Sequence, residues 1–246
     1  MIEIQNLYKA FSGLPVLTDV SLTIEDAKTF AVIGASGSGK SVLMKNVVGL
    51  MKPDRGTILV DGVDISTLSY GETRKLREQF GVLFQGGALF DSMNAFDNVA
   101  FPLRMITEMR EPEIRKRVEE CLETVHLPEA GSKMPSELSG GMQKRVALAR
   151  AVALQPKYIF YDEPTSGLDP ITSNAINELI KDLDARLGIT GIVITHDMHS
   201  CLHIADRIGF LHEGNMHWVG TVDELHSATD ETLLDFVKAS EYRIGP

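Results

Sequence analysis

The chain has 246 residues, of which 43% are hydrophobic and 24% are charged, and its formal net charge is −10. This length allows one large domain with a full core, and the acidic balance argues against a nucleic-acid-binding surface, which is normally basic. Cys121 and Cys201 form no Cys-x-x-Cys pair, so we expect a reduced cytosolic protein without disulfides. The N-terminus predicts no secretory signal, and no apolar run reaches the roughly 18–20 residues that span a bilayer.

An antiparallel flap is predicted at the start of the chain. Residues 2–8 and 16–24 alternate between apolar and polar side chains, as strands do, and the turn 12–15 connects them. Phe11 lies at the tip of this flap. An exposed ring there could stack on adenine, and a core position at a strand end is an equally good interpretation.

The segment 34–41 reads Gly-x-x-x-x-Gly-Lys-Ser, between an apolar run at 29–33 and a predicted helix. This is the strand–turn–helix context of a phosphate-binding loop. Glycines let backbone N–H groups surround an anion, Lys40 is expected to reach the β- and γ-phosphates, and the Ser41 hydroxyl is expected to ligate Mg²⁺. A glycine-rich turn that caps a helix explains the complete motif less well. The predicted nucleotide contacts are Gly34, Ala35, Ser36, Gly37, Ser38, Gly39, Lys40 and Ser41.

The next segment continues the core and then becomes helical. Strands are predicted at 57–60 and 80–84, with a short helix near 72–77 between them. From about residue 92 to residue 155 helical periodicity dominates, with Pro112 at a helix start and the last helix ending before Pro156. This predicts a helical subdomain inserted into an α/β core.

After the insertion the core resumes, with strands predicted at 158–162 and 191–195, a hairpin at 207–219, and helices at 171–187 and 229–239. We therefore expect a single domain over residues 1–246. Its core with the flap covers about 1–91 and 156–228, the helical subdomain about 92–155, and a C-terminal tail about 229–246.

Two acidic residues, Asp162 and Glu163, directly follow an apolar strand. A carboxylate at a strand end can hold Mg²⁺, and Glu163 is placed to orient or deprotonate a water in line with the γ-phosphate. A phosphate-binding loop upstream in the same chain strengthens this interpretation. The alternative for Asp162 is a helix N-cap or a turn residue.

A second glycine motif, Ser139-Gly140-Gly141, precedes a predicted helix and could form another anion site. One nucleotide does not need two such loops from one chain. The two are reconciled if two copies face each other, with Ser139 of one copy meeting the γ-phosphate held by the other in a two-fold dimer. An ordinary Ser N-cap is the alternative.

These motifs, together with Gln85, Ser166–Asp169 and His196, resemble in order and approximate spacing the ATP-binding subunits of ABC transporters, over nearly the whole chain. The resemblance implies an α/β fold with a P-loop NTPase core, an antiparallel β flap and an inserted helical subdomain. It also implies that ATP hydrolysis drives a partner permease, with ATP and Mg²⁺ bound.

The resemblance implies roles for single residues as well. Phe11 would stack on adenine, Gln85 would sense Mg²⁺ and the attacking water, and Asp169 would communicate across the dimer. His196 would contact the γ-phosphate. Met142 stands where the common signature has Gln; since the phosphate-facing parts are Ser139 and the glycines, we expect activity to survive.

Residues 84–104 and the Leu-Ser-Gly-Gly-Met signature are similar to the ATPases of Mla and Mce-type lipid transport systems. This implies phospholipid transport between bacterial membranes by a homodimer bound to an integral MlaE-like permease, with MlaD-like Mce-domain and MlaB-like STAS-domain subunits. The place would be the cytoplasmic face of the inner membrane. The side chains expected to line a docking groove for a permease helix, or else to join the two subdomains, are Leu89, Phe90, Met93 and Phe96.

Other interpretations remain open at this point. Three His, an Asp and a Cys within residues 196–203 could suggest zinc. The ATPase could serve an importer of amino acids or other small solutes. It could also be a soluble ABC-type regulatory ATPase, although those carry two cassettes in one chain. An SMC-type DNA-repair ATPase would need long coiled coils between its nucleotide motifs, and this chain has none.

Overall fold

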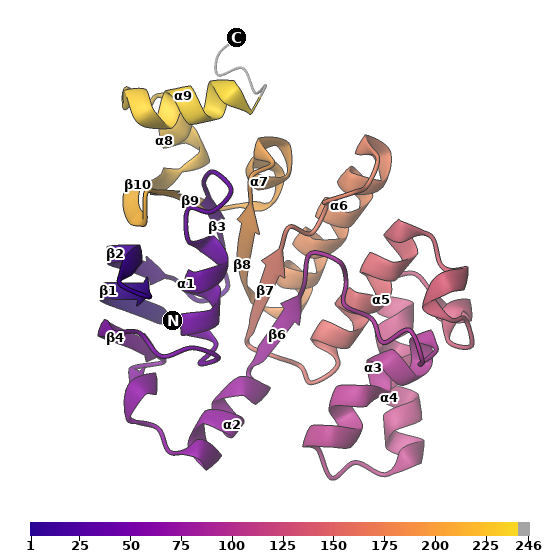
Figure 1. Cartoon of the computed structure of the whole chain (residues 1–246). Coiled ribbons are helices and arrows are strands. Elements are labelled where there is room, and N and C mark those ends of the chain that lie inside the picture. Colours follow the sequence, from indigo (N-terminus) through magenta and orange to yellow (C-terminus); the bar gives the residue numbers. More distant parts are fainter. Residues whose placement is uncertain (241–246) are drawn as a thin grey trace.

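A six-stranded sheet forms the centre of the chain, which a computed structural model describes from residue 1 to residue 240 (Figure 1). Its strand order is β10-β9-β3-β8-β7-β6, in which β10 pairs antiparallel with β9 and all the other neighbours are parallel. These strands confirm the predicted core. Their bounds are β3 (Thr29–Ile33), β6 (Phe80–Leu83), β7 (Tyr158–Asp162), β8 (Thr190–Thr195), β9 (Arg207–His212) and β10 (Asn215–Thr221).

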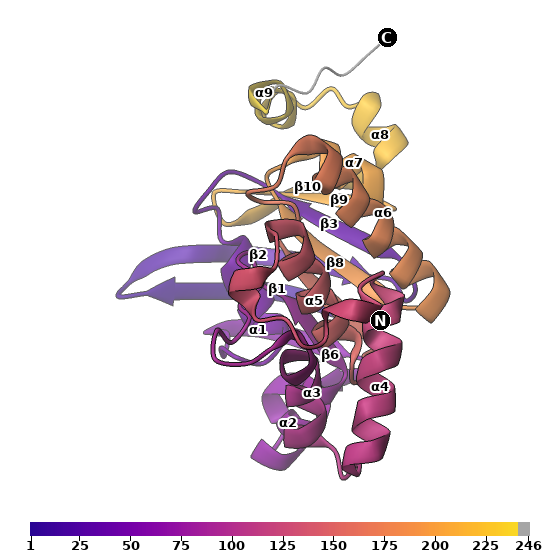
Figure 2. The ribbon, with the colours of Figure 1, turned by 90° about the vertical axis from the view of Figure 1, so that its right-hand side faces the viewer.

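The flap is a second, antiparallel sheet, and it is wider than predicted. In the described chain its order is β2-β1-β4-β5. The predicted hairpin is extended by β4, whose Val60 pairs with Ile2 of β1. Figure 1 shows the flap on the opposite side of the molecule from α4 (Glu111–Thr124) and α6 (Pro170–Leu187), and Figure 2 gives the view from the side of these helices. The bounds are β1 (Ile2–Phe11), β2 (Leu14–Ile24), β4 (Arg55–Val60) and β5 (Val63–Asp64).

Helices pack around the central sheet. Three of them, α3, α4 and α5, lie within residues 92–155, and we call this part of the chain the helical segment. Pro112 lies in the first turn of α4, as its fixed φ favours, and Asn94 caps α3 by accepting from the N–H of Asp97 at 2.7 Å. Among residues 1–240, no helix has the length and apolar character needed to span a bilayer. The bounds are α1 (Lys40–Val47), α2 (Tyr70–Glu78), α3 (Ala95–Ile106), α4 (Glu111–Thr124), α5 (Gly140–Val152), α6 (Pro170–Leu187), α7 (Met198–Ile204), α8 (Val222–His226) and α9 (Glu231–Ala239), with 3-10 turns at Ile65–Thr67, Pro128–Ala130 and Pro135–Glu137.

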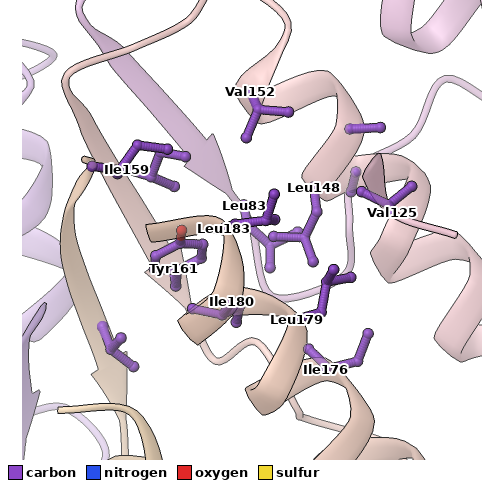
Figure 3. Close-up of a cluster of buried hydrophobic side chains, with 14 of the residues drawn as sticks. Leu83, Val125, Leu148, Val152, Ile159, Tyr161, Ile176, Leu179, Ile180 and Leu183 are labelled. Atoms are coloured by element: carbon purple, nitrogen blue, oxygen red, sulfur yellow. The ribbon is translucent and has the colours of Figure 1, made fainter. Parts of the chain in front are cut away.

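The central strands are apolar on both faces because each face packs against a different layer. In β3, Phe30 and Val32 join the cluster under the flap and α1, whereas Ala31 and Ile33 join the cluster under the helices. Successive side chains of a strand point to opposite faces, which produces this division. Figure 3 shows part of the helical cluster, where Leu148 of α5 and Leu179 of α6 meet side chains of β6 and β7.

The parallel order also decides where the polar motifs meet. Ile33 of β3 is in register with Thr195 of β8, and Asp162 of β7 is in register with Ile194. Carboxyl ends of parallel strands lie at one edge of a sheet, which is where ligands bind in such folds. The loops that follow β3, β6, β7 and β8 are thereby brought together.

Candidate active site

A cavity of about 750 Å³ lies at this edge of the central sheet. It gathers the glycine-rich loop, both acidic residues after β7, the residue after β8 and the glutamine beyond β6. Its lining residues are Val16, Ala35, Ser36, Gly37, Gly39, Lys40, Ser41, Val42, Gln85, Asp162, Glu163, Ile194, His196, Phe236, Ala239 and Ser240. Phe236 and Ala239 of α9 and the adjacent Ser240 were not anticipated, because nothing in their local pattern links them to a site.

The loop between β3 and α1 has the conformation that anion binding needs. Gly39 caps α1 with φ of 106°, and a Cβ there would lie 2.9 Å from the carbonyl oxygen of Val16. Lys40 is buried, and its Nζ donates to the carbonyl oxygens of Gly34 at 2.7 Å and Ala35 at 2.9 Å. The buried Oγ of Ser38 has no hydrogen-bond partner among the described residues. A polar ligand in the loop would satisfy that hydroxyl.

Two carboxylates and a buried ammonium share this site. Burial lowers the pKa of Lys40, while the charges of Glu163 and Asp162 act in the opposite direction. Burial, and then the charge of Glu163, raises the pKa of Asp162. The arrangement favours a bound cation beside Asp162, since a positive charge relieves the repulsion between the two carboxylates.

Oxygen donors suited to Mg²⁺ line the same cavity. They are the hydroxyl of Ser41, the side-chain amide oxygen of Gln85 and the carboxylate of Asp162. Hydroxyl, amide and carboxylate oxygens are the ligands that hard divalent cations prefer. Asp162 is the last residue of β7 and begins no helix, so the N-cap interpretation of this residue is wrong.

The carboxylate of Glu163 is held from two sides. Its Oε1 accepts from the backbone N–H of His196 at 3.2 Å and lies 2.7 Å from Nδ1 of that ring. Its Oε2 accepts from the hydroxyl of Thr195 at 3.1 Å. Thr195, the last residue of β8, was not singled out from the sequence, although it directly precedes His196.

Gln85 and Phe11 are both exposed. Gln85 follows β6 and its Nε2 lies 3.4 Å from Oγ of Ser166, which connects the loops after β6 and β7. Phe11 is 43% exposed at the end of β1, so its interpretation as a core residue is wrong. It is not among the described residues that line the cavity, and stacking on adenine stays a prediction.

The second glycine motif begins α5. Ser139 caps this helix by accepting from the N–H of Met142 at 3.3 Å, a bond that both interpretations of this motif allow. Asp169 caps α6 by accepting from the N–H groups of Ile171 and Thr172, each at 3.0 Å. Neither Ser139 nor Asp169 is among the described lining residues of the cavity. Their contact with a nucleotide held by a second copy of the chain stays a prediction.

The zinc interpretation of residues 196–203 is wrong. Within residues 1–240, no three His, Cys, Asp or Glu side chains come together as a metal site. Cys201 is buried in the core, and Nε2 of His203 lies 2.7 Å from Oε1 of Glu178. The burial of Cys201 and the pairing of His203 with Glu178 could not be seen from the spacing of these residues alone.

Comparisons with known proteins find an ABC transporter family and ATP-binding proteins of transport systems. A family model described as ABC transporter matches residues 17–166. The "Intermembrane phospholipid transport system ATP-binding protein MlaF" of Haemophilus influenzae is 42% identical over 97% of this chain and 90% of that protein, and its Escherichia coli K12 counterpart is 41% identical over 90% and 82%. The "Probable ribonucleotide transport ATP-binding protein mkl" of Mycobacterium tuberculosis H37Rv is 42% identical over 100% of this chain and 68% of that protein.

Solved structures agree with the sequence relatives. The cbiO1 structure from Clostridium perfringens, described as part of an ABC transporter complex, has a TM-score of 0.85 at 32% identity, over 97% of this chain and 94% of that one. A dimeric ATP-binding cassette in a post-hydrolysis state, bound to ADP and Pi, has a TM-score of 0.82 at 33% identity, over 90% and 99%.

Proposed function

Since the chain belongs to the ABC transporter family as an ATP-hydrolysing subunit, we propose that it powers a membrane permease that moves phospholipid between bacterial membranes. The observation that carries the ATPase role is the cavity in which the phosphate-binding loop faces Asp162, Glu163 and His196. The proposal for the cargo rests on the 41–42% identity with the MlaF proteins.

The phosphates of ATP bind to the loop between β3 and α1. Lys40 exchanges its bonds to the carbonyl oxygens of Gly34 and Ala35 for bonds to the β- and γ-phosphates. The unpartnered hydroxyl of Ser38 gains a phosphate oxygen as its acceptor. Ser41, Gln85 and Asp162 would hold Mg²⁺, whose charge neutralises the phosphate oxygens.

Glu163 orients the attacking water and accepts its proton as the bond to the γ-phosphorus forms. Its carboxylate is fixed for this by Thr195 and by the His196 N–H, so little reorganisation is needed. The exposed ring of His196 can then turn toward the γ-phosphate. The bond that breaks joins the γ-phosphorus to the bridging oxygen, and ADP leaves with its electron pair. Lys40 and Mg²⁺ would neutralise the charge that develops on this oxygen, so no protein acid is needed.

A second copy of the chain completes each site. Ser139, Gly140 and Gly141 stand at the start of α5 and Asp169 at the start of α6, all outside the cavity of their own chain. A two-fold dimer would bring these helix starts to the γ-phosphate of the partner, where backbone N–H groups bind the anion. ATP does work in such a cycle because it binds the closed dimer better than the open one.

The permease is proposed to dock beside the loop after β6. Phe84 and Phe90 are about two-fifths exposed, and the ring of Phe90 lies 4.7 Å from that of Phe101. Leu89 and Phe96 instead pack against the core and join the subdomains. Exposed aromatic side chains of this kind receive the apolar face of a partner helix. The partners would be an MlaE-like permease with Mce-domain and STAS-domain subunits, at the cytoplasmic face of the inner membrane.

Glu163→Gln tests this function. The variant should bind ATP normally, lose about 100-fold or more in turnover and trap the closed dimer. Turnover is measured as phosphate release, with Glu178→Gln as a control because Glu178 is an exposed glutamate paired with His203. Near-normal hydrolysis by the Glu163 variant would remove the general-base assignment.

The trapped protein also tests the cargo. We would purify it with ATP and Mg²⁺ from its native membranes and identify bound proteins and lipids by mass spectrometry. A permease with an Mce-domain protein and phospholipid supports the proposal. A permease of the amino-acid importer type, or ribonucleotide beyond the bound ATP, contradicts the lipid cargo. Recovery only from the soluble fraction would favour a regulatory ATPase.

A further inference from the structure

Lys144 connects three parts of the molecule through one buried ammonium group. It lies on α5 and is only 5% exposed. Its Nζ donates to the carbonyl oxygen of Gln85, beyond β6, and to the carbonyl oxygen of Glu163, beyond β7, the latter at 3.2 Å. Both acceptors belong to residues that line the nucleotide cavity. The side chain of Lys144 itself is not among the lining residues.

Packing does not explain a lysine at this place. The following residues of α5, such as Val146 and Leu148, are fully buried and apolar. Burying an ammonium carries a desolvation cost, and burial accordingly lowers the pKa of Lys144, while the charges of Asp162 and Glu163 oppose the shift. The two hydrogen bonds to main-chain carbonyl oxygens offset part of this cost.

One of the two acceptors belongs to a residue with an uncommon backbone conformation. Glu163 has φ of 47°, a left-handed conformation that is uncommon for a non-glycine residue. Its N–H donates to the carbonyl oxygen of Ile194 at 2.8 Å, and its own carbonyl oxygen accepts from Lys144. The peptide groups on both sides of the residue are therefore held, and the carboxylate is aimed at Thr195 and His196.

We propose that Lys144 is a positioning residue that couples the helical segment carrying Ser139 to the loops carrying Gln85 and Glu163. A movement of α5, driven by the permease or by dimer closure, displaces the main chains of Gln85 and Glu163 together. Hydrolysis then responds to the position of α5. This inference rests on the proposed role of Glu163 in activating water.

Two arginines of the same region provide matched controls, because each also donates to two main-chain carbonyl oxygens. Arg150 on α5 donates to Gly87 at 2.6 Å and Ala88 at 2.8 Å, so it holds the loop after β6 without reaching Glu163. Arg117 on α4 donates to residues 152 and 153 at the end of α5, within the helical segment.

The experiment compares Lys144→Met, Lys144→Arg, Arg150→Met and Arg117→Met in the full chain. We would measure kcat and KM for ATP, the Kd of ATP, and the stimulation of hydrolysis by the assembled transporter. Lys144→Met should lower kcat about tenfold or more, keep the Kd of ATP within about threefold, and abolish the stimulation. Lys144→Arg keeps the hydrogen-bond donors, so it should retain most of kcat and most of the stimulation.

The controls separate coupling from stability. Arg117→Met should keep kcat and stimulation within about threefold of the unchanged protein. The kcat and stimulation of Arg150→Met should lie between those of Arg117→Met and Lys144→Met. A Lys144→Met protein with unchanged kcat and stimulation overturns the inference, as does a loss equal to that of Arg117→Met. If Lys144→Met does not fold, Lys144→Ser, whose side chain is too short to reach the carbonyl oxygens of Gln85 and Glu163, replaces it with the same criteria.

Glu163→Gln distinguishes this inference from the proposed function. If Glu163→Gln hydrolyses ATP normally, the assignment of the general base fails, whatever Lys144 does. If Glu163→Gln is inactive while Lys144→Met is fully active and stimulated, the failure belongs to Lys144 alone.

Discussion

Asp184 is expected to make the stability of the fold depend on pH near neutrality. It lies on α6 under the central sheet and is 6% exposed. Its Oδ1 accepts from the hydroxyl of Tyr161 at 2.5 Å, and its Oδ2 accepts from the hydroxyl of Thr29 at 3.1 Å. Burial raises the pKa of Asp184 from 3.8 to about 7; the two hydrogen bonds oppose the shift, and the charge of Asp206 adds to it.

The sign and size of the effect follow from this pKa. The folded state holds the proton more tightly than the unfolded chain, so the contribution of Asp184 to the free energy of unfolding is largest below about pH 4. It is lost as the pH rises toward 7, the pKa in the folded state. The whole shift corresponds to about 4 kcal/mol, of which about 2 kcal/mol falls between about pH 5.5 and pH 8.

Asp184→Asn should remove this dependence. The amide keeps an acceptor for Tyr161 and offers a donor to Thr29, so it imitates the protonated acid at every pH. Urea unfolding at several pH values measures the free energy of unfolding for both proteins. The variant should gain about 2 kcal/mol relative to the unchanged protein between about pH 5.5 and pH 8.

The matched control is Asp182→Asn. Asp182 is an exposed residue of the same helix that pairs with Arg186 at 3.3 Å. Its substitution should leave the pH dependence of unfolding almost unchanged, because exposed pairs contribute little. If Asp184→Asn and Asp182→Asn show the same pH dependence as the unchanged protein, Asp184 is not held protonated by burial and the reasoning is refuted.

Two substitutions test the nucleotide site itself. Thr195→Val keeps the shape of the side chain but removes the hydrogen bond to Glu163, worth about 1.5–3 kcal/mol, so kcat should fall about tenfold or more. Thr195→Ser keeps the hydroxyl and should remain active. Equal kcat values for the Val and Ser variants would rule out a role of the Thr195 hydroxyl in holding Glu163. Gly34→Ala would place a Cβ 2.3 Å from the carbonyl oxygen of Leu211. Calorimetry should show at least about tenfold weaker ATP binding. Gly37→Ala, whose Cβ would meet nothing within 4 Å, should lose less, and an equal loss would exclude the steric explanation.

Much of the fold could be predicted from local patterns. The alternating residues of β1 and β2 and the apolar runs of β3, β7 and β8 were recognised because strand periodicity is a property of neighbouring residues. The pairing of β4 with β1 could not be recognised in this way. It joins Gln5 to Thr57 across the whole phosphate-binding loop and α1, and no local signal specifies such a partner.

Some residues of the candidate site could likewise be predicted from local motifs, and others could not. The motif residues Lys40, Asp162 and His196 were predicted individually, and the structure places them around one cavity. Phe236 of α9 also reaches this cavity, although its position in the sequence suggests only the apolar face of a short helix. Its place depends on how α9 packs on β9, where its ring lies 5.0 Å from that of Phe210.

The sequence by itself determined the phosphate-binding loop, because the glycine dihedral angles and the start of α1 depend on contiguous residues between 34 and 41. Only the tertiary structure decided that Lys144 meets Gln85 and Glu163, which lie 59 and 19 residues away along the chain. The physical reason is that a side chain's charge and reach are local properties, whereas its hydrogen-bond partners depend on which strands lie side by side. The parallel order of β6, β7 and β8 sets those partners.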